Sequence, residues 1–168
     1  MIYLDAAAIV KMVRRERGTR ELIAWLNDRP DEPLVSSSLV EVEVPGALRR
    51  SAPQALAGVP GMITRLYRFE IDAAVRATAS AYGDPLLRSL DSIHLATAQL
   101  LAGQAGADPL VFVTYDQRLL KAAQDIGLRA EAPGCWDPRL TPPRAAPPRG
   151  RCRRRGRRSS RSAGRWRG

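Results

Sequence analysis

Four acidic residues in this 168-residue sequence stand where a strand-like pattern gives way to a helical one: Asp5, Glu41, Asp91 and Asp116. Asp5 follows the apolar run MIYL and Asp116 follows VFVTY, whereas Glu41 and Asp91 open predicted helices. Carboxylates are hard oxygen ligands that select Mg²⁺ or Mn²⁺ over zinc, and such ions activate water for hydrolysis. All four are candidate catalytic residues, and Asp5, Asp91 and Asp116 are candidate metal ligands.

The segments that would position these acids alternate between strands and helices. Strand-like runs are expected at residues 1–5, 32–37, 65–71, 110–115 and 128–132, and most of the sequence between them has helical spacing. This alternation predicts an α/β fold with a mainly parallel central sheet of four to five strands flanked by helices. Ligands of such sheets bind beyond the carboxyl ends of the strands, so we expect the four acids to converge there.

Each acid also has a simpler explanation. Asp116 fits a helix N-cap, Glu41 fits a capping box that begins at Ser38, and Asp91 complements the dipole of its helix. Asp5 is harder to explain in this way, because it lies among apolar residues where a charge needs a partner. His94 follows Asp91 by one turn among apolar neighbours, which favours a buried, hydrogen-bonded side chain over a metal ligand.

The net charge of +10 comes from the C-terminal segment. Residues 1–138 contain all 17 acidic residues and 15 of the 27 basic ones, for a net charge of −2, and we expect them to form one domain. Residues 139–168 contain 12 arginines, no acid and many Pro, Gly and Ser, which predicts a disordered basic tail. Two explanations stay open: an arm that binds RNA phosphates, or GC-rich DNA translated beyond or outside its proper reading frame.

Neither a secretory signal nor a membrane-spanning run is present in the sequence. These absences predict a soluble protein of the cytoplasm. The two cysteines, Cys135 and Cys152, form neither a metal-binding spacing nor a disulfide framework, and we assign them no role.

Four stretches in this order resemble the PIN-domain ribonucleases, and among them the VapC-type toxins of type II toxin–antitoxin systems. They are IYLDAAAIVK with Asp5, SSLVEVEV with Glu41, LRSLDSIHLATA with Asp91 and FVTYDQRLLKAA with Asp116, and the resemblance extends from Met1 to about Pro133. It implies a PIN-like three-layer fold and an endoribonuclease that uses these acids with Mg²⁺ or Mn²⁺. It also implies a homodimer that cuts tRNA or ribosomal RNA, inhibits translation and is silenced by a cognate antitoxin.

Two departures from the family pattern carry expectations of their own. Ala6 and Ala7 follow the first acid, where family members commonly have a hydroxyl residue, so we expect weakened metal affinity. Pro45 and Gly46 lie inside the helix predicted from about Ser38 to Arg50, so we expect a kink or an early break after Val44.

Other classes of protein fit less well. A phosphoryl-transfer enzyme of the haloacid-dehalogenase type needs a second Asp where Ala7 stands, and a receiver domain needs a lysine after a late strand. The only lysines, Lys11 and Lys121, lie inside predicted helices. A non-catalytic PIN-like binding module stays open because of the Ala6–Ala7 change. Since no Ser or Cys stands beside a base, direct hydrolysis to 5′-phosphate and 3′-hydroxyl ends is the expected reaction.

Overall fold

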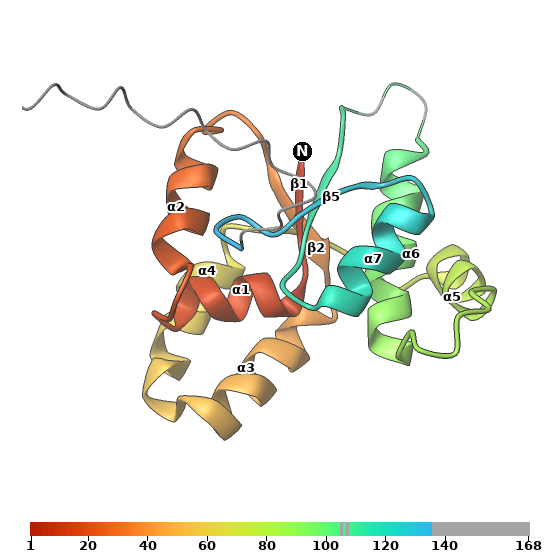
Figure 1. Ribbon diagram of the computed structural model, residues 1–168. Helices are drawn as coiled ribbons and strands as arrows, with labels where there is room; N and C mark the ends of the chain where they lie inside the picture. Colours follow the sequence, from red (N-terminus) through yellow and green to blue (C-terminus); the bar gives the residue numbers. More distant parts are fainter. Residues whose placement is uncertain (105, 107, 136–168) are drawn as a thin grey trace, which may run out of the picture. The chain divides into compact units, whose positions relative to one another are not determined.

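The computed structural model describes residues 1–104, 106 and 108–135 (Figure 1). In chain order its elements are β1 (Ile2–Leu4), α1 (Ala6–Val13), α2 (Thr19–Asn27), β2 (Leu34–Ser37), α3 (Val40–Ser51), η1 (Pro53–Gly58), α4 (Val59–Ile63), β3 (Tyr67–Phe69), α5 (Ala73–Ser80), α6 (Ser89–Ala102), β4 (Val111–Val113), α7 (Gln117–Asp125) and β5 (Arg129–Glu131). The basic tail predicted at residues 139–168 and Cys152 lie outside the described residues. None of the described helices has the length and apolar character needed to cross a membrane.

All five strands are parallel and form one sheet in the order β3-β2-β1-β4-β5. The first strand occupies the centre, where Ile2 lies opposite Leu34 of β2 on one side and Val111 of β4 on the other. The predicted α/β fold is confirmed. Because β2 and β3 lie on one side of β1 whereas β4 and β5 lie on the other, the direction of strand addition reverses between β1 and β4, and ligands of such sheets bind at the carboxyl ends of the strands there.

Side chains that alternate along β1 enter two separate hydrophobic cores. Ile2 and Leu4 pack with α1 to α4, whereas Tyr3 packs with α6 and α7, and all three side chains are fully buried. Figure 1 shows the two groups of helices on opposite sides of the sheet, with α5 packed against α6. The expected three-layer arrangement is therefore present, with the sheet as the middle layer.

The helix α3 continues from Val40 to Ser51 with Pro45 inside it, so the predicted early break after Val44 is wrong. A proline at this position removes the single backbone hydrogen bond that residue 45 would donate to Glu41. Val44 and Leu48 are fully buried in the core on the α1 side of the sheet. Their packing holds the helix together across the missing bond.

Candidate active site

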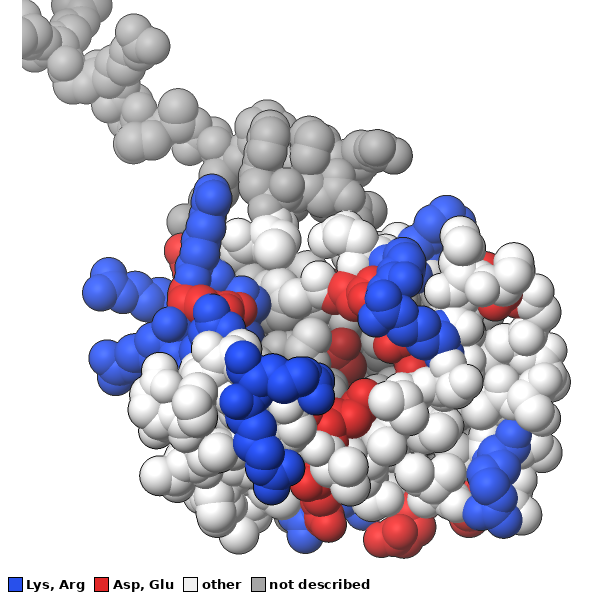
Figure 2. Space-filling view, turned by 90° about the horizontal axis from the view of Figure 1, so that it is seen from below, with Lys and Arg blue, Asp and Glu red and all other residues white. Residues whose placement is uncertain are grey.

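Asp5 and Asp116 lie at the carboxyl ends of the neighbouring strands β1 and β4, and one hydroxyl connects them. The Thr114 Oγ1 donates to Asp5 Oδ2 at 2.5 Å and accepts from the backbone N–H of Asp116 at 3.1 Å. Both aspartates are also helix N-caps, Asp5 for α1 and Asp116 for α7. Figure 2, seen from below relative to Figure 1, shows acidic side chains in a hollow of this face, with basic side chains on its flanks.

Asp5 is a buried carboxylate with only 3% of its surface exposed. Its Oδ1 accepts from the Ala8 N–H at 2.8 Å, while Thr114 donates to its other oxygen. Burial raises the pKa of Asp5 to about 6, although His94 and these hydrogen bonds act in the opposite direction. The donors to Asp5 are thus a backbone amide and a threonine far along the chain. They orient the carboxylate even though Ala6 and Ala7 have no hydroxyl group.

Asp91 and Asp116 form a second pair with contrasting surroundings. Asp91 is in the first turn of α6, and its Oδ2 is buried with no hydrogen-bond partner among the described residues. Burial and then the charge of Asp116 raise the pKa of Asp91. Asp116 accepts from the Arg118 N–H at 2.8 Å and pairs with the Arg118 guanidinium at 3.0 Å, which lowers the pKa of Asp116. The charges of Arg88 and Arg118 lower the pKa of Asp91 more weakly, so what distinguishes Asp91 is a buried carboxylate oxygen without a hydrogen-bond partner among the described residues.

The structure places Glu41 away from this site. Its side chain is 51% exposed, and its carboxylate pairs with Arg68 of β3 at 2.6 Å. The capping box predicted with Ser38 is wrong, because the first residues of α3 have no side-chain cap. Glu43, two residues further along α3, lies instead near Asp5, where its charge contributes to the raised pKa of that residue. Sequence reasoning missed Glu43.

A buried hydrogen-bonded chain holds Glu43 in place. His94 Nε2 lies 2.7 Å from Glu43 Oε2, and His94 Nδ1 lies 2.9 Å from the hydroxyl of Tyr3. The imidazole is 2% exposed, which agrees with the expectation of a buried and satisfied histidine. Each ring nitrogen therefore has a hydrogen-bonding partner, and Nε2 donates to the carboxylate of Glu43. The chain therefore fixes one oxygen of Glu43.

The described acids lie in two pairs, Asp5 with Glu43 and Asp91 with Asp116, rather than in one closed cluster. Within residues 1–104, 106 and 108–135, no group of three or more His, Cys, Asp or Glu side chains is close enough to hold a metal ion. The chemistry of the pairs nevertheless fits a hard divalent cation. The buried charge of Asp5 and the unpaired oxygen of Asp91 both need positive charge, and all the donors are oxygens.

Comparison with known proteins gives consistent matches. The family model described as PIN domain matches residues 2–125. The chain is similar to Ribonuclease VapC35 of Mycobacterium tuberculosis, with 48% identity over 134 residues that cover 80% of this chain and 98% of that protein. Ribonuclease VapC46 of the same species is 38% identical over 132 residues, which cover 79% of this chain and 97% of that protein. Among solved structures, the DNA-bound VapBC of Salmonella typhimurium has a TM-score of 0.50 at 23% identity, covering 78% of this chain and 96% of that one.

Proposed function

Because the chain belongs to the PIN-domain family, we propose that it is a metal-dependent endoribonuclease and the toxin of a toxin–antitoxin pair that inhibits translation. Two relatives named as VapC ribonucleases support the proposal, because the matched residues span nearly the whole length of each relative. The single observation in the structure that carries it is the buried, unpaired oxygen of Asp91 beside a second acid at the carboxyl edge of the sheet.

We assign the binding of Mg²⁺ or Mn²⁺ to Asp5, Asp91 and Asp116. When bound, the ion supplies a lowered pKa for coordinated water and neutralises charge on the phosphate oxygens. Thr114 fixes the carboxylate of Asp5, and Arg118 keeps Asp116 ionised. These two contacts present the acids in their charged forms, which are the forms that bind cations.

We assign to Glu43 the catalytic role that the sequence suggested for Glu41, because Glu41 forms an ion pair with Arg68. His94 occupies Oε2 of Glu43 and leaves Oε1 to accept a proton from the attacking water. Water attacks the phosphorus, the P–O3′ bond breaks and the 3′-oxygen leaves, so the products carry 5′-phosphate and 3′-hydroxyl ends.

The proposed partners are a structured RNA of the tRNA or ribosomal RNA class, a second copy of the chain and a cognate antitoxin, all in the cytoplasm. Candidates for phosphate contacts in the folded part of the chain are Arg14, Arg15 and Arg118. Arg118 is engaged with Asp116, and Arg14 lies 3.7 Å from Glu16. Arg15 is exposed and has no ion-pair partner among the described residues, so it is the member of this set that remains open to RNA.

Incubation of purified protein with total RNA tests the proposal. Wild type should cleave with Mn²⁺ or Mg²⁺ and stop with EDTA, and Asp91→Asn should be folded and inactive. Asp125→Asn, at the exposed end of α7, is the matched control and should cleave normally. Cleavage that persists in Asp91→Asn would point to a contaminating nuclease or a different site. RNA binding without cleavage by wild type would identify a non-catalytic PIN-like module instead.

A further inference from the structure

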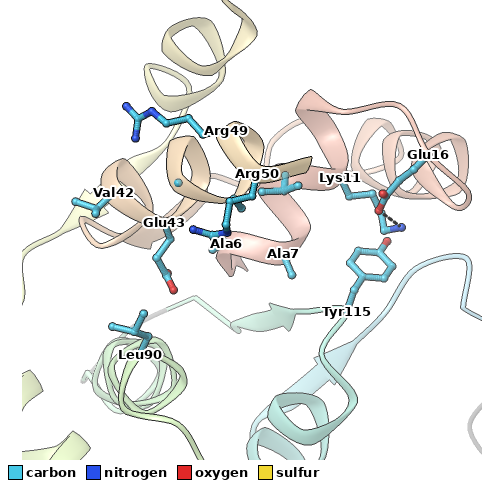
Figure 3. A pocket seen from close by; sticks show the side chains of 13 residues that line it. Ala6, Ala7, Lys11, Glu16, Val42, Glu43, Arg49, Arg50, Leu90 and Tyr115 are labelled. Carbon is cyan, nitrogen blue, oxygen red and sulfur yellow. Dashed lines mark ion pairs between the residues drawn. The ribbon is translucent and has the colours of Figure 1, made fainter. Parts of the chain in front are cut away.

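A cavity of about 660 Å³ opens beside Glu43 (Figure 3). It lies between α1 and α3, with Leu90 of α6 and Tyr115 completing its wall. Its volume falls within the range of about 300–1,000 Å³ that small-molecule sites occupy. Because Glu43 belongs both to this wall and to the candidate active site, an occupant of the cavity would adjoin the reacting phosphate.

Small residues keep the cavity open. On α1 they are Ala6 and Ala7, and on α3 they are Gly46 and Ala47, which lie on the same helical face as Glu43. The Ala6–Ala7 pair, which departs from the family's hydroxyl residue, therefore contributes an apolar wall. A flat ring or a sugar can lie against such a wall and bury its own apolar surface.

Two cations of the cavity, Arg49 and Arg50, have no carboxylate partner in the described part of the chain. Figure 3 shows the guanidinium of Arg50 beside Ala6 on the side of Glu43, whereas Arg49 points away. No ion pair involves Arg50 among the described residues, in contrast to Arg118, which pairs with Asp116 at 3.0 Å. A guanidinium binds phosphate through two parallel hydrogen bonds, so Arg50 provides an anion-binding group at the edge of an apolar space.

We propose that this cavity binds the ribonucleotide unit next to the scissile phosphodiester bond. Arg50 holds the phosphate of that nucleotide, and the Ala6–Ala7 and Gly46–Ala47 walls border its sugar and base. The inference rests on the proposed ribonuclease function. Bases in a duplex are stacked, whereas unpaired bases can be turned outward into a pocket. The cavity therefore selects a nucleotide in a loop or single strand.

A set of arginine variants tests the phosphate contact. With a single-stranded oligoribonucleotide that wild type cleaves, Arg50→Ala should raise KM about 10- to 100-fold, while kcat changes little. Arg50→Lys should restore part of the loss, since it keeps the charge without the fork of donors. Arg49→Ala removes the same charge from the same helix and should raise KM clearly less.

Filling the cavity tests the wall. Ala7 is exposed, so Ala7→Leu can fold while its longer side chain enters the space. We expect weaker cleavage but an unchanged rise in melting temperature on adding Mn²⁺. Fluorescence anisotropy of the same labelled oligoribonucleotide, without metal, measures binding independently of turnover, and there too Arg50→Ala should bind more weakly than Arg49→Ala.

The outcomes separate the two proposals. If wild type neither cleaves RNA nor gains stability from Mn²⁺, the proposed function is wrong. The anisotropy comparison of Arg50→Ala with Arg49→Ala then tests by itself whether the cavity binds RNA. If wild type cleaves and both Arg50→Ala and Ala7→Leu match it in KM and in binding, the nucleotide site is wrong. It is also wrong if these variants keep wild-type RNA kinetics but no longer bind the purified cognate antitoxin, because the cavity would then belong to that protein.

Discussion

Replacement of Asp5 by Asn isolates the free energy of burying its charge. Asn has nearly the same size, keeps an acceptor for the Ala8 N–H and can donate to Thr114 Oγ1. Burial raises the pKa of Asp5 from 3.8 to about 6, a difference of about 2. Since one unit of pKa corresponds to about 1.4 kcal/mol, the cost in the ion-free protein is about 3 kcal/mol.

The sign of the effect follows from which state holds the proton. The unfolded chain releases it near pH 4 and the folded protein near pH 6, so between these values the folded state binds more protons. In EDTA the free energy of unfolding of wild type should therefore fall by about 3 kcal/mol relative to Asp5→Asn as pH rises from 3 to 7. Urea unfolding at four or five pH values measures the difference.

Asp72→Asn provides the control for this measurement. Asp72 also caps a helix, α5, through a 2.8 Å bond from the Val75 N–H, but it is exposed. Its substitution should leave the pH profile parallel to that of wild type. At pH 7, saturating Mg²⁺ should raise the free energy of unfolding of wild type more than that of Asp5→Asn, because the ion binds the carboxylate of the folded protein. Parallel profiles for wild type and Asp5→Asn in EDTA would refute the argument from burial.

Three further changes have defined outcomes. In EDTA, Asp116→Ala should lower the free energy of unfolding by about 1 kcal/mol, because α7 loses its N-cap. Asp116→Asn should keep that free energy but show a smaller rise in melting temperature on adding Mg²⁺ than wild type. Equal rises in wild type and Asp116→Asn would mean that Asp116 is a cap and not a metal ligand. His94→Phe should lower the free energy of unfolding by about 1–3 kcal/mol and reduce kcat, because Glu43 loses its buried donor, and Tyr3→Phe should cost less; unchanged kcat in His94→Phe would exclude a positioning role. Deletion of residues 139–168 should flatten the salt dependence of RNA binding without abolishing cleavage, and loss of turnover at low salt would contradict the proposed domain division.

The sequence was informative about the edge of the sheet because each signal there is local. Apolar runs that end in Asp5 or near Asp116 mark strand ends, and the parallel topology then brings those ends to one side of the molecule. Asp91 follows the same logic, because it lies in the first turn of α6 and near enough to Asp116 for that charge to raise its pKa. Each of these placements needed only periodicity and the rule for parallel sheets.

The choice between Glu41 and Glu43 needed information that the local pattern does not contain. Both acids lie in the alternating run VEVEV, and the packing of α3 against its neighbours decides which one turns inward. Gly46 and Ala47, on the face of Glu43, were the available signal, since small residues leave room beside a functional group. The supports of the site were beyond local reasoning, because Thr114 and Asp5 are 109 residues apart and His94 and Glu43 are 51 apart.

The central position of β1 affects when the site can exist during synthesis. The first strand made pairs with β4, the fourth of five, so Asp5 emerges from the ribosome more than a hundred residues before Thr114 and Asp116. Pairing between strands so distant in sequence forms late, because the long loop must close before any contact offsets its entropy. A nascent or truncated chain that ends before β4 therefore has Asp5 without the neighbour that holds it. The candidate active site is therefore assembled only near the end of translation, and an incomplete chain lacks it.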